Sequence, residues 1–145
     1  MTTRRALLLA LAALALGCAP RGDARDVDDA AGVAERFLRA LDENDAASTW
    51  SSLASPLRAS VPEAEWPPRI AGMRAPLGDA GTRELSSAFY TETLEGAPQG
   101  KYFVLEFESS FSKAACGERV VAMFEKGAWR VAGYVVRDTR PHPAR

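Results

Sequence analysis

Apolar residues recur along this chain with two periods, a helical one in the first half and a two-residue one in the second. Between Asp26 and Glu43 the apolar side chains fall on one helical face. That face consists of Ala30, Val33, Ala34, Phe37, Leu38 and Leu41. The spacing predicts an amphipathic helix over 26–43. Asp28 and Asp29 lie in its first turn, where the helix dipole favours acidic side chains.

Two further helical segments are predicted before the middle of the chain. Asn44 and Asp45 end the first helix and can cap a second, which runs from Ala46 towards Ala54 with Trp50 and Leu53 buried. The run Ser60-Val61-Pro62-Glu63 matches a capping box and begins a third helix.

Pro67 and Pro68 conflict with a third helix carried through to Met73, because an interior proline costs about 3 kcal/mol or more. The sequence therefore predicts a short turn, a break, and a second short turn. The segment 75–78 ends the helical half of the chain.

The second half alternates between apolar and polar residues. Four strands are predicted, over 83–93, 101–111, 117–125 and 128–137. Short connections imply an antiparallel meander, and the fold class is α+β, with N-terminal helices on one face of a curved four-stranded sheet. The face predicted to cover the helices carries Leu85, Phe89, Phe103, Leu105, Phe107, Val120, Ala122, Phe124, Trp129, Val131 and Val135.

The opposite face of this sheet mixes charges with apolar side chains. Its apolar members are predicted to be Tyr90, Tyr102, Val104, Val121, Met123 and Tyr134. A sheet face towards water is normally more polar, and contiguous apolar patches mark interaction sites. We therefore expect a partner protein or a second copy of the chain to bind here. The alternative is that the tail 138–145 or the N-terminal linker covers this face.

The N-terminus has the parts of a secretion signal. Arg4 and Arg5 precede the apolar run 6–16, and eleven residues are too few to cross a bilayer core, which needs about 20. With Gly17 before Cys18, the segment resembles a bacterial lipoprotein signal, which implies lipidation of Cys18 and a membrane anchor. The alternative is an ordinary secretory signal cut nearby, with Cys18 an incidental thiol.

The anchor sets the expected organisation and location of the protein. The predicted parts are a signal peptide (1–17), a lipid-anchored linker (18–27), one α+β domain (28–137) and a tail (138–145). The expected location is the cell envelope. Because Ala19 is not aspartate, the resemblance to known lipoprotein sorting favours the outer membrane facing the periplasm over the inner membrane.

Charge argues against a nucleic-acid partner. The whole chain has 18 basic and 19 acidic residues, and loss of Arg4 and Arg5 with the signal would leave 16 basic residues against 19 acidic ones. No basic patch emerges.

No catalytic residue, metal site or cofactor is predicted. The one histidine, His142, lies between prolines in the tail, and Cys116 is expected as an unpaired thiol in the hairpin connection 112–117. Metal-ligand spacings and glycine-rich phosphate loops are absent from the sequence. Acid–base catalysis would need ionisable side chains on the inner face, whose predicted positions are apolar.

Several short blocks resemble the uncharacterised bacterial family called domain of unknown function 4019, over roughly 33–137. They are Phe37-Leu38, Trp50, 75–78, Arg83-Glu84-Leu85, 96–102 and 129–134. The family is similar in element order to nuclear-transport-factor-2-like and cystatin-like cone folds, which implies a pocket between helices and sheet. We expect a non-catalytic binding module, with a small apolar ligand in that pocket as the alternative and a small acid–base enzyme as the third hypothesis.

Overall fold

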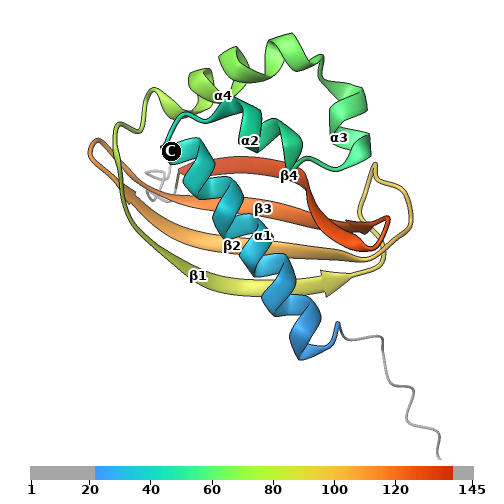
Figure 1. Cartoon of the computed structure of the whole chain (residues 1–145). Coiled ribbons are helices and arrows are strands. Elements are labelled where there is room, and N and C mark those ends of the chain that lie inside the picture. The colour runs from blue at the N-terminus through green and yellow to red at the C-terminus, as the bar shows by residue number, and fades with distance from the viewer. Residues whose placement is uncertain (1–21, 139–145) are drawn as a thin grey trace, which may run out of the picture.

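The computed structural model of the chain describes residues 22–138, in which helices come first and strands second (Figure 1). The helices are α1 (Ala24–Asp42), α2 (Ala46–Ser51), α3 (Ser55–Ser60), the 3-10 turn η1 (Glu63–Glu65) and α4 (Trp66–Arg74). The strands are β1 (Ala80–Thr91), β2 (Tyr102–Phe111), β3 (Ala115–Glu125) and β4 (Ala128–Asp138). The predicted α+β class is confirmed: N-terminal helices pack on a four-stranded antiparallel sheet.

Helix α1 follows the predicted stripe but begins two residues earlier than expected. Asp23 caps it, because its carboxylate accepts a hydrogen bond from the backbone N–H of Asp26 at 2.8 Å. The stripe is buried against the sheet through Ala30, Ala34, Phe37, Leu38 and Leu41. The helix ends at Asp42, and Asn44, the residue after its C-cap Glu43, adopts a positive φ of 56°.

Asp45 caps α2 as predicted, with its carboxylate accepting from the backbone N–H of Ser48 at 3.0 Å. This helix is shorter than expected, and Thr49 rather than Trp50 is its buried residue. Leu53 is buried as predicted, in a segment that pairs in parallel with Val131 of β4. The backbone N–H of Ala54 donates to the Val131 carbonyl at 2.7 Å, so this segment covers part of the β4 edge.

The predicted break at Pro67 and Pro68 is wrong, because the two prolines lie in the first turn of α4. The first backbone N–H groups of a helix have no partner within it, so proline loses nothing there and its fixed φ suits the helix. The short turn η1 comes directly before α4, which continues past the prolines through Ile70 to Arg74.

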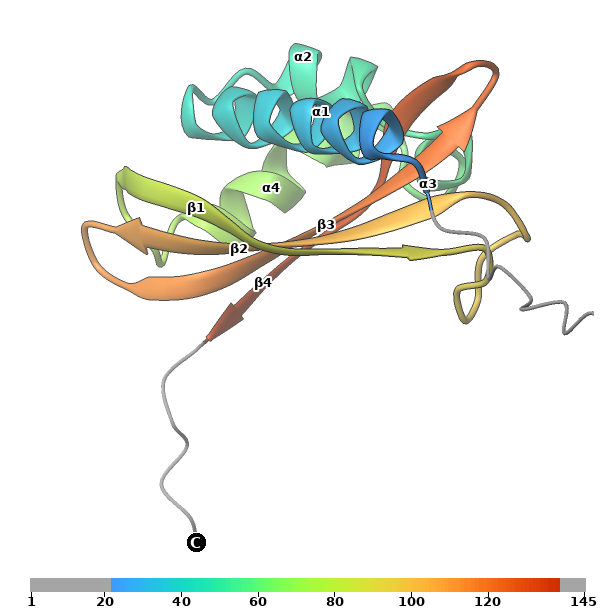
Figure 2. The same ribbon diagram turned by 90° about the horizontal axis from the view of Figure 1, so that it is seen from below.

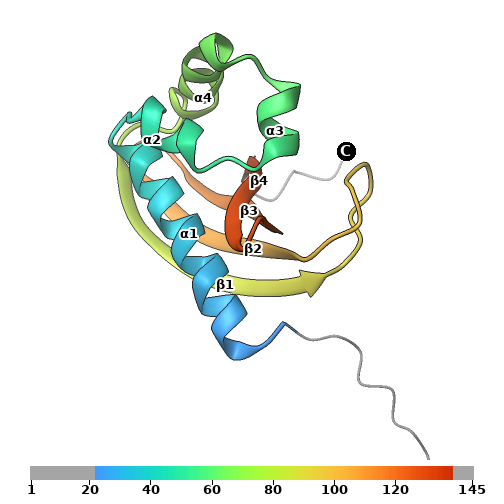
Figure 3. The ribbon, with the colours of Figure 1, turned by 45° about the vertical axis from the view of Figure 1, so that its right-hand side comes forward.

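The strands form a meander in the order β1-β2-β3-β4, with antiparallel pairing throughout. The β3–β4 connection is a two-residue turn of Lys126 and Gly127, both with positive φ, at 50° and 81°. Seen from below, all the helices of residues 22–138 lie on one side of the twisted sheet, and the other side carries no helix of this part of the chain (Figure 2). Helix α1 crosses the covered face, and the shorter helices gather beside β4 (Figure 3). We call the helix-covered side the inner face and the opposite side the outer face.

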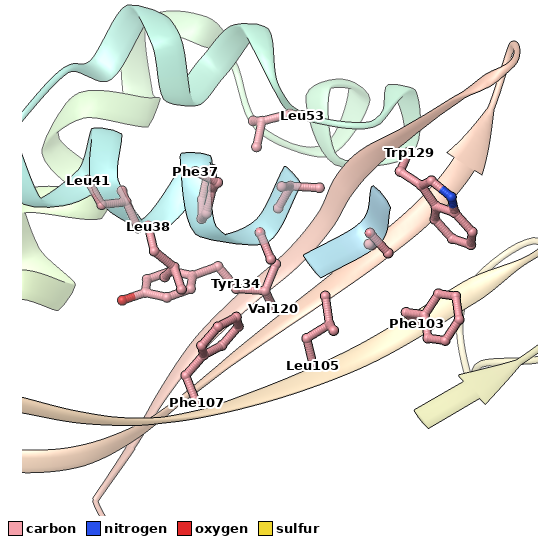
Figure 4. Packing of buried hydrophobic residues seen from close by; sticks show 14 of the residues in the cluster. Phe37, Leu38, Leu41, Leu53, Phe103, Leu105, Phe107, Val120, Trp129 and Tyr134 are labelled. Carbon is pink, nitrogen blue, oxygen red and sulfur yellow. The ribbon is translucent and has the colours of Figure 1, made fainter. Parts of the chain in front are cut away.

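The core fills the space between α1 and the inner face, as the close view shows (Figure 4). Phe37 lies between two other rings, with centroids 6.5 Å from Trp66 and 5.6 Å from Tyr134. Phe103, Leu105, Phe107, Val120, Ala122, Trp129 and Val131 are buried on the inner face as predicted. The middle of the domain is therefore packed with side chains.

A bulge in β1 changes which of its residues face the helices. Leu85 pairs with Phe107, but Ser87 already pairs with Glu106, so Ser86 is an extra residue. Beyond it the alternation is inverted: Tyr90 packs against the core, and Phe89 lies on the outer face with 65% of its surface exposed. The prediction that Phe89 covers the helices is wrong for this reason. Leu85 keeps the inner face but is 40% exposed.

A second bulge inverts the alternation in β4. Val131 pairs with Ala122 and Gly133 pairs with Val121, which leaves Ala132 as the extra residue. Tyr134 therefore turns to the inner face and is buried, whereas Val135 turns outwards and is 50% exposed. Both assignments reverse the predicted ones.

Cys116 lies on β3 and not in the hairpin connection, which is a correction to the prediction. It is buried on the inner face beside Leu77 and Phe111 in a small second core cluster. Burial in an apolar cluster is typical of a structural cysteine.

Candidate functional site

The outer face carries a short apolar row that crosses all four strands. Phe89 on β1 pairs with Val104 on β2, Val104 with Val121 on β3, and Val121 with Gly133 on β4. A Cβ atom added at Gly133 would lie 3.6 Å from the Val121 side chain, so the missing side chain leaves a gap on the outer face. Val104 and Val121 are half-buried, and Phe89 stands out from the sheet.

The six residues predicted as an interaction face divide into three groups, and the third group is Tyr102 alone. Val104, Val121 and Met123 lie on the outer face and are half-buried. Tyr90 and Tyr134 lie on the inner face because of the two bulges. Phe89 and Val135, which the sequence assigned to the core, replace them as the exposed large apolar residues of the outer face.

Tyr102 has the outer-face alternation of β2 but is fully buried. The loop after β1 folds over it, and its hydroxyl donates to the Pro98 carbonyl at 2.5 Å. Burial raises the pKa of this hydroxyl, which keeps it a donor. Tyr102 therefore anchors the loop and is not available to a partner.

Charged side chains lie beside the apolar row. Glu106 accepts from Arg119 at 2.6 Å and from Arg137, which joins β2, β3 and β4. Burial raises the pKa of Glu106, but the two arginines outweigh it and the net pKa is lowered. Glu106 is therefore a member of a cross-strand charge pair. Glu84 and Glu108 are different, because they are directly opposite each other and form no ion pair with any of the residues 22–138.

The inner face holds an ionisable cluster that the sequence did not predict. Glu118 on β3 is fully buried, and the side chains around it come from α1, α4 and three strands. The cluster consists of Asp42, Arg74, Arg83, Ser109, Glu118 and Tyr134. The expectation that the inner positions are apolar is therefore wrong at positions on all four strands.

Both oxygens of the Glu118 carboxylate are fully partnered. Oε1 accepts from Arg74 at 2.8 Å and from the Tyr134 hydroxyl at 2.6 Å. Oε2 accepts from Arg83 at 2.7 Å and from the Ser109 hydroxyl at 2.5 Å. Four donors satisfy the lone pairs of a carboxylate, which is the condition under which such a charge can be buried.

Asp42 closes the cluster by binding both arginines. It accepts from Arg83 at 2.8 Å and 3.1 Å and also from Arg74. Burial raises the pKa of Asp42, but hydrogen bonds from Arg83 and then Arg74 outweigh it and lower the net pKa. Two carboxylates thus balance two guanidinium groups.

Burial and then the neighbouring Glu118 carboxylate raise the pKa of the Tyr134 hydroxyl, which stays protonated and donates. A general acid or base needs a proton site that can change state near neutral pH and reach a substrate. Here the hydroxyl is held protonated, and the oxygens of Glu118 are already occupied. The cluster therefore ties the helices to the sheet.

An apolar groove lies between α4 and the ends of β3 and β4. Its volume is about 800 Å³, within the size range of small-molecule pockets. Met73, Leu77, Ala114, Cys116 and Val136 supply apolar lining, and Arg69 and Lys113 supply cationic groups. The groove lies beside the core and not inside it, because Phe37, Trp66 and Tyr134 fill the centre of the domain.

Other predicted features have simple outcomes. Cys18 and His142 lie outside residues 22–138, so the lipidation site and the tail histidine stay predictions. Residues 22–138 contain no group of three or more potential metal ligands. None of their helices is long and apolar enough to span a bilayer.

Fold and surfaces together define a small α+β domain whose described helices all cover the same face of the sheet. The sequence profile described as protein of unknown function DUF4019 matches residues 33–134. The chain belongs to this family, as its short sequence blocks indicated. The match begins within α1 and ends at Tyr134, so it spans the helical layer and the sheet. No curated protein and no solved structure matches the chain.

Proposed function

We propose that this DUF4019 domain is a non-catalytic interaction module that binds a protein partner through the outer face of its sheet. The observation that carries the proposal is the exposure of Phe89 and Val135 beside Val104 and Val121 on a face without helices. A stable single domain turns large apolar side chains inward where it can, and exposed contiguous ones mark interfaces. The saturated cluster around Glu118 supports a non-catalytic role.

Site-specific photo-crosslinking in the producing cell tests this function. A photoreactive amino acid placed at Val104 should yield a crosslinked protein adduct on a denaturing gel. The same amino acid at Ala59, which is exposed on α3, is the matched control and should give none. Equal crosslinking at the two positions, or none at Val104, would refute the outer face as the binding surface.

We also propose that the module is tethered to a membrane in the cell envelope through a fatty-acylated Cys18, with the outer membrane facing the periplasm as the favoured site. The order of Arg4, Arg5, the apolar run 6–16 and Gly17 before Cys18 supports this anchor. More than one acyl chain would make the attachment stable. Metabolic labelling with a palmitate analogue should label the chain and not its Cys18→Ala variant; labelling of both would exclude Cys18 as the site.

A small apolar ligand in the groove beside α4 is the second candidate function. The groove volume of about 800 Å³ and its apolar lining favour it, and Arg69 and Lys113 would suit an anionic headgroup. Lipid that copurifies with the full chain should appear in native mass spectrometry and be lost on Ala114→Trp, which fills the groove. An unchanged mass spectrum in the variant would remove this candidate.

A further inference from the structure

The two halves of the outer face differ in charge and in side-chain size. On β1 and β2 it carries Glu84, Glu106 and Glu108, whereas on β3 and β4 it carries Arg119, Arg130 and Arg137. Glu106 binds Arg119 and Arg137 of its own chain, and Glu84 and Glu108 are left without an ion pair among residues 22–138. Glu125 on β3 is an exception, and it is bonded to the backbone N–H of Ser55 in the helical layer at 2.9 Å. The face is thus acidic at one edge and basic at the other.

Side-chain size changes in the same direction along the central row. The row begins with the exposed ring of Phe89, continues through Val104 and Val121, and ends at Gly133, which has no side chain. A parallel row begins with Glu84 and Glu108 and ends with Gly117 and Arg137. The central row thus has its largest side chain at β1 and none at β4. The parallel row has acidic side chains at β1 and β2 and a basic one at β4.

We propose that the partner of the outer face is a second copy of this chain, stacked sheet against sheet about a two-fold axis that runs parallel to the strands between β2 and β3. This inference rests on the proposed function and names its partner. A two-fold interface must be self-complementary, with residue i of one copy facing residue j of the other and the reverse. The outer face meets this condition for this axis.

The axis reverses the strand order, so β1 of one copy lies over β4 of the other. Phe89 then faces the gap at Gly133 of the second copy, and Val104 faces Val121. In the parallel row Glu84 faces Arg137. Stacked sheets lie about 10 Å apart, a distance that side chains from both faces fill together.

The opposite choice of axis, across the strands, fits worse. It places each strand over its own copy, so the acidic β1 and β2 of one chain face the acidic β1 and β2 of the other. Like charges across an interface disfavour it. The strand-parallel axis also brings Arg137 of the second copy to Glu84, whose position directly opposite Glu108 is unfavourable within one chain.

Charge reversal with mixing tests both the partner and the axis. The full chain, purified in a non-ionic detergent, should sediment as a dimer. In the proposed dimer, position 84 of each copy faces position 137 of the other, which gives two equivalent contacts. Glu84→Arg places two arginines together at both contacts, and Arg137→Glu places two carboxylates together at both. Each variant alone should dimerise at least tenfold more weakly than the unmodified chain, and an equimolar mixture should regain the dimer because both contacts become attractive. Glu63→Arg, on the exposed surface of η1, is the control and should leave the dimer unchanged.

The outcomes separate this inference from the proposed function. A chain that stays monomeric at all concentrations, while Val104 crosslinks to a protein of another mass, overturns the second copy as the partner and leaves the interaction face in place. Absence of crosslinks at Val104 overturns both. A dimer whose two variants do not recover on mixing overturns the strand-parallel axis.

Discussion

Glu118 places a negative charge in the interior of the domain, where an unpaired charge would be very costly. The alternation of β3 would have indicated it, because Glu118 is two residues before Val120 and shares its face. The partners could not be predicted in the same way. Arg74 comes from α4 and Asp42 from the end of α1, and strand periodicity says nothing about where these helix ends lie.

Removing the Glu118 carboxylate should destabilise the domain strongly. Glu118→Leu leaves Arg74 and Arg83 buried against an apolar side chain, and breaking one side of a buried ion pair costs about 3–5 kcal/mol. Urea unfolding followed by circular dichroism measures the loss. Glu108→Gln is the control on the outer face of the same sheet and should change the free energy of unfolding by less than about 0.5 kcal/mol. Equal effects of the two substitutions would show that the cluster contributes nothing.

At the scale of elements, alternation predicted the strands and their order, and it failed at two single residues. Ser86 and Ala132 are the extra residues of the bulges, and neither has a sequence feature that marks it. One unpaired residue inverts every later side chain of its strand. The fold was therefore predictable, whereas the composition of the outer face was correct only on β2 and β3, where the ladder is regular.

The β1 bulge makes a prediction about two neighbouring aromatic residues. Tyr90→Ser removes a ring that packs edge-on against Phe103 at 5.4 Å between centroids, and it should cost about 1–2 kcal/mol for a half-buried ring. Phe89→Ser removes an exposed ring and should cost less than about 0.5 kcal/mol. Thermal unfolding at a concentration where the chain is monomeric compares them. The reverse order of effects would show that the bulge is misplaced.

The prolines of α4 give a second test at this scale. Pro68→Ala should change the free energy of unfolding by less than about 1 kcal/mol, because Pro68 lies in the first turn and its missing N–H costs nothing there. Ala71→Pro, one turn further along the same exposed side, should cost about 3 kcal/mol. Unfolding in urea measures both. A large loss for Pro68→Ala would mean that proline has a specific role here.

At the scale of the whole molecule, the buried cluster joins the helical layer to the sheet and makes that junction sensitive to acid. The pKa of Asp42 is lowered from 3.8 in the folded chain, so its ionised form stabilises the fold above that pH. This stabilisation should be lost as the pH falls below about 4, towards the lowered pKa of the folded state. The difference in unfolding free energy between the unmodified chain and Asp42→Asn, measured from pH 7 to 3, should shrink accordingly. A difference that is constant across this range would contradict the lowered pKa.

The outer face of the sheet is the surface through which we propose that the whole molecule binds its partner. Helices cover the inner face of the sheet (Figure 2). The outer face carries an apolar row flanked by opposite charges. The element order predicts that the helices cover one face of the sheet. It does not predict which side chains lie on the outer face, because that depends on the strand register. The mass of the particle in solution reports on that face.

Light scattering of the full chain in detergent, with the polypeptide mass separated from the detergent mass by absorbance and refractive index, is the decisive measurement. The unmodified chain should have the mass of two chains. Val121→Lys, in the middle of the outer face, should have the mass of one chain and still unfold cooperatively, whereas Ala59→Lys on α3 should remain a dimer. A Val121→Lys variant that keeps the mass of two chains would contradict association through the outer face.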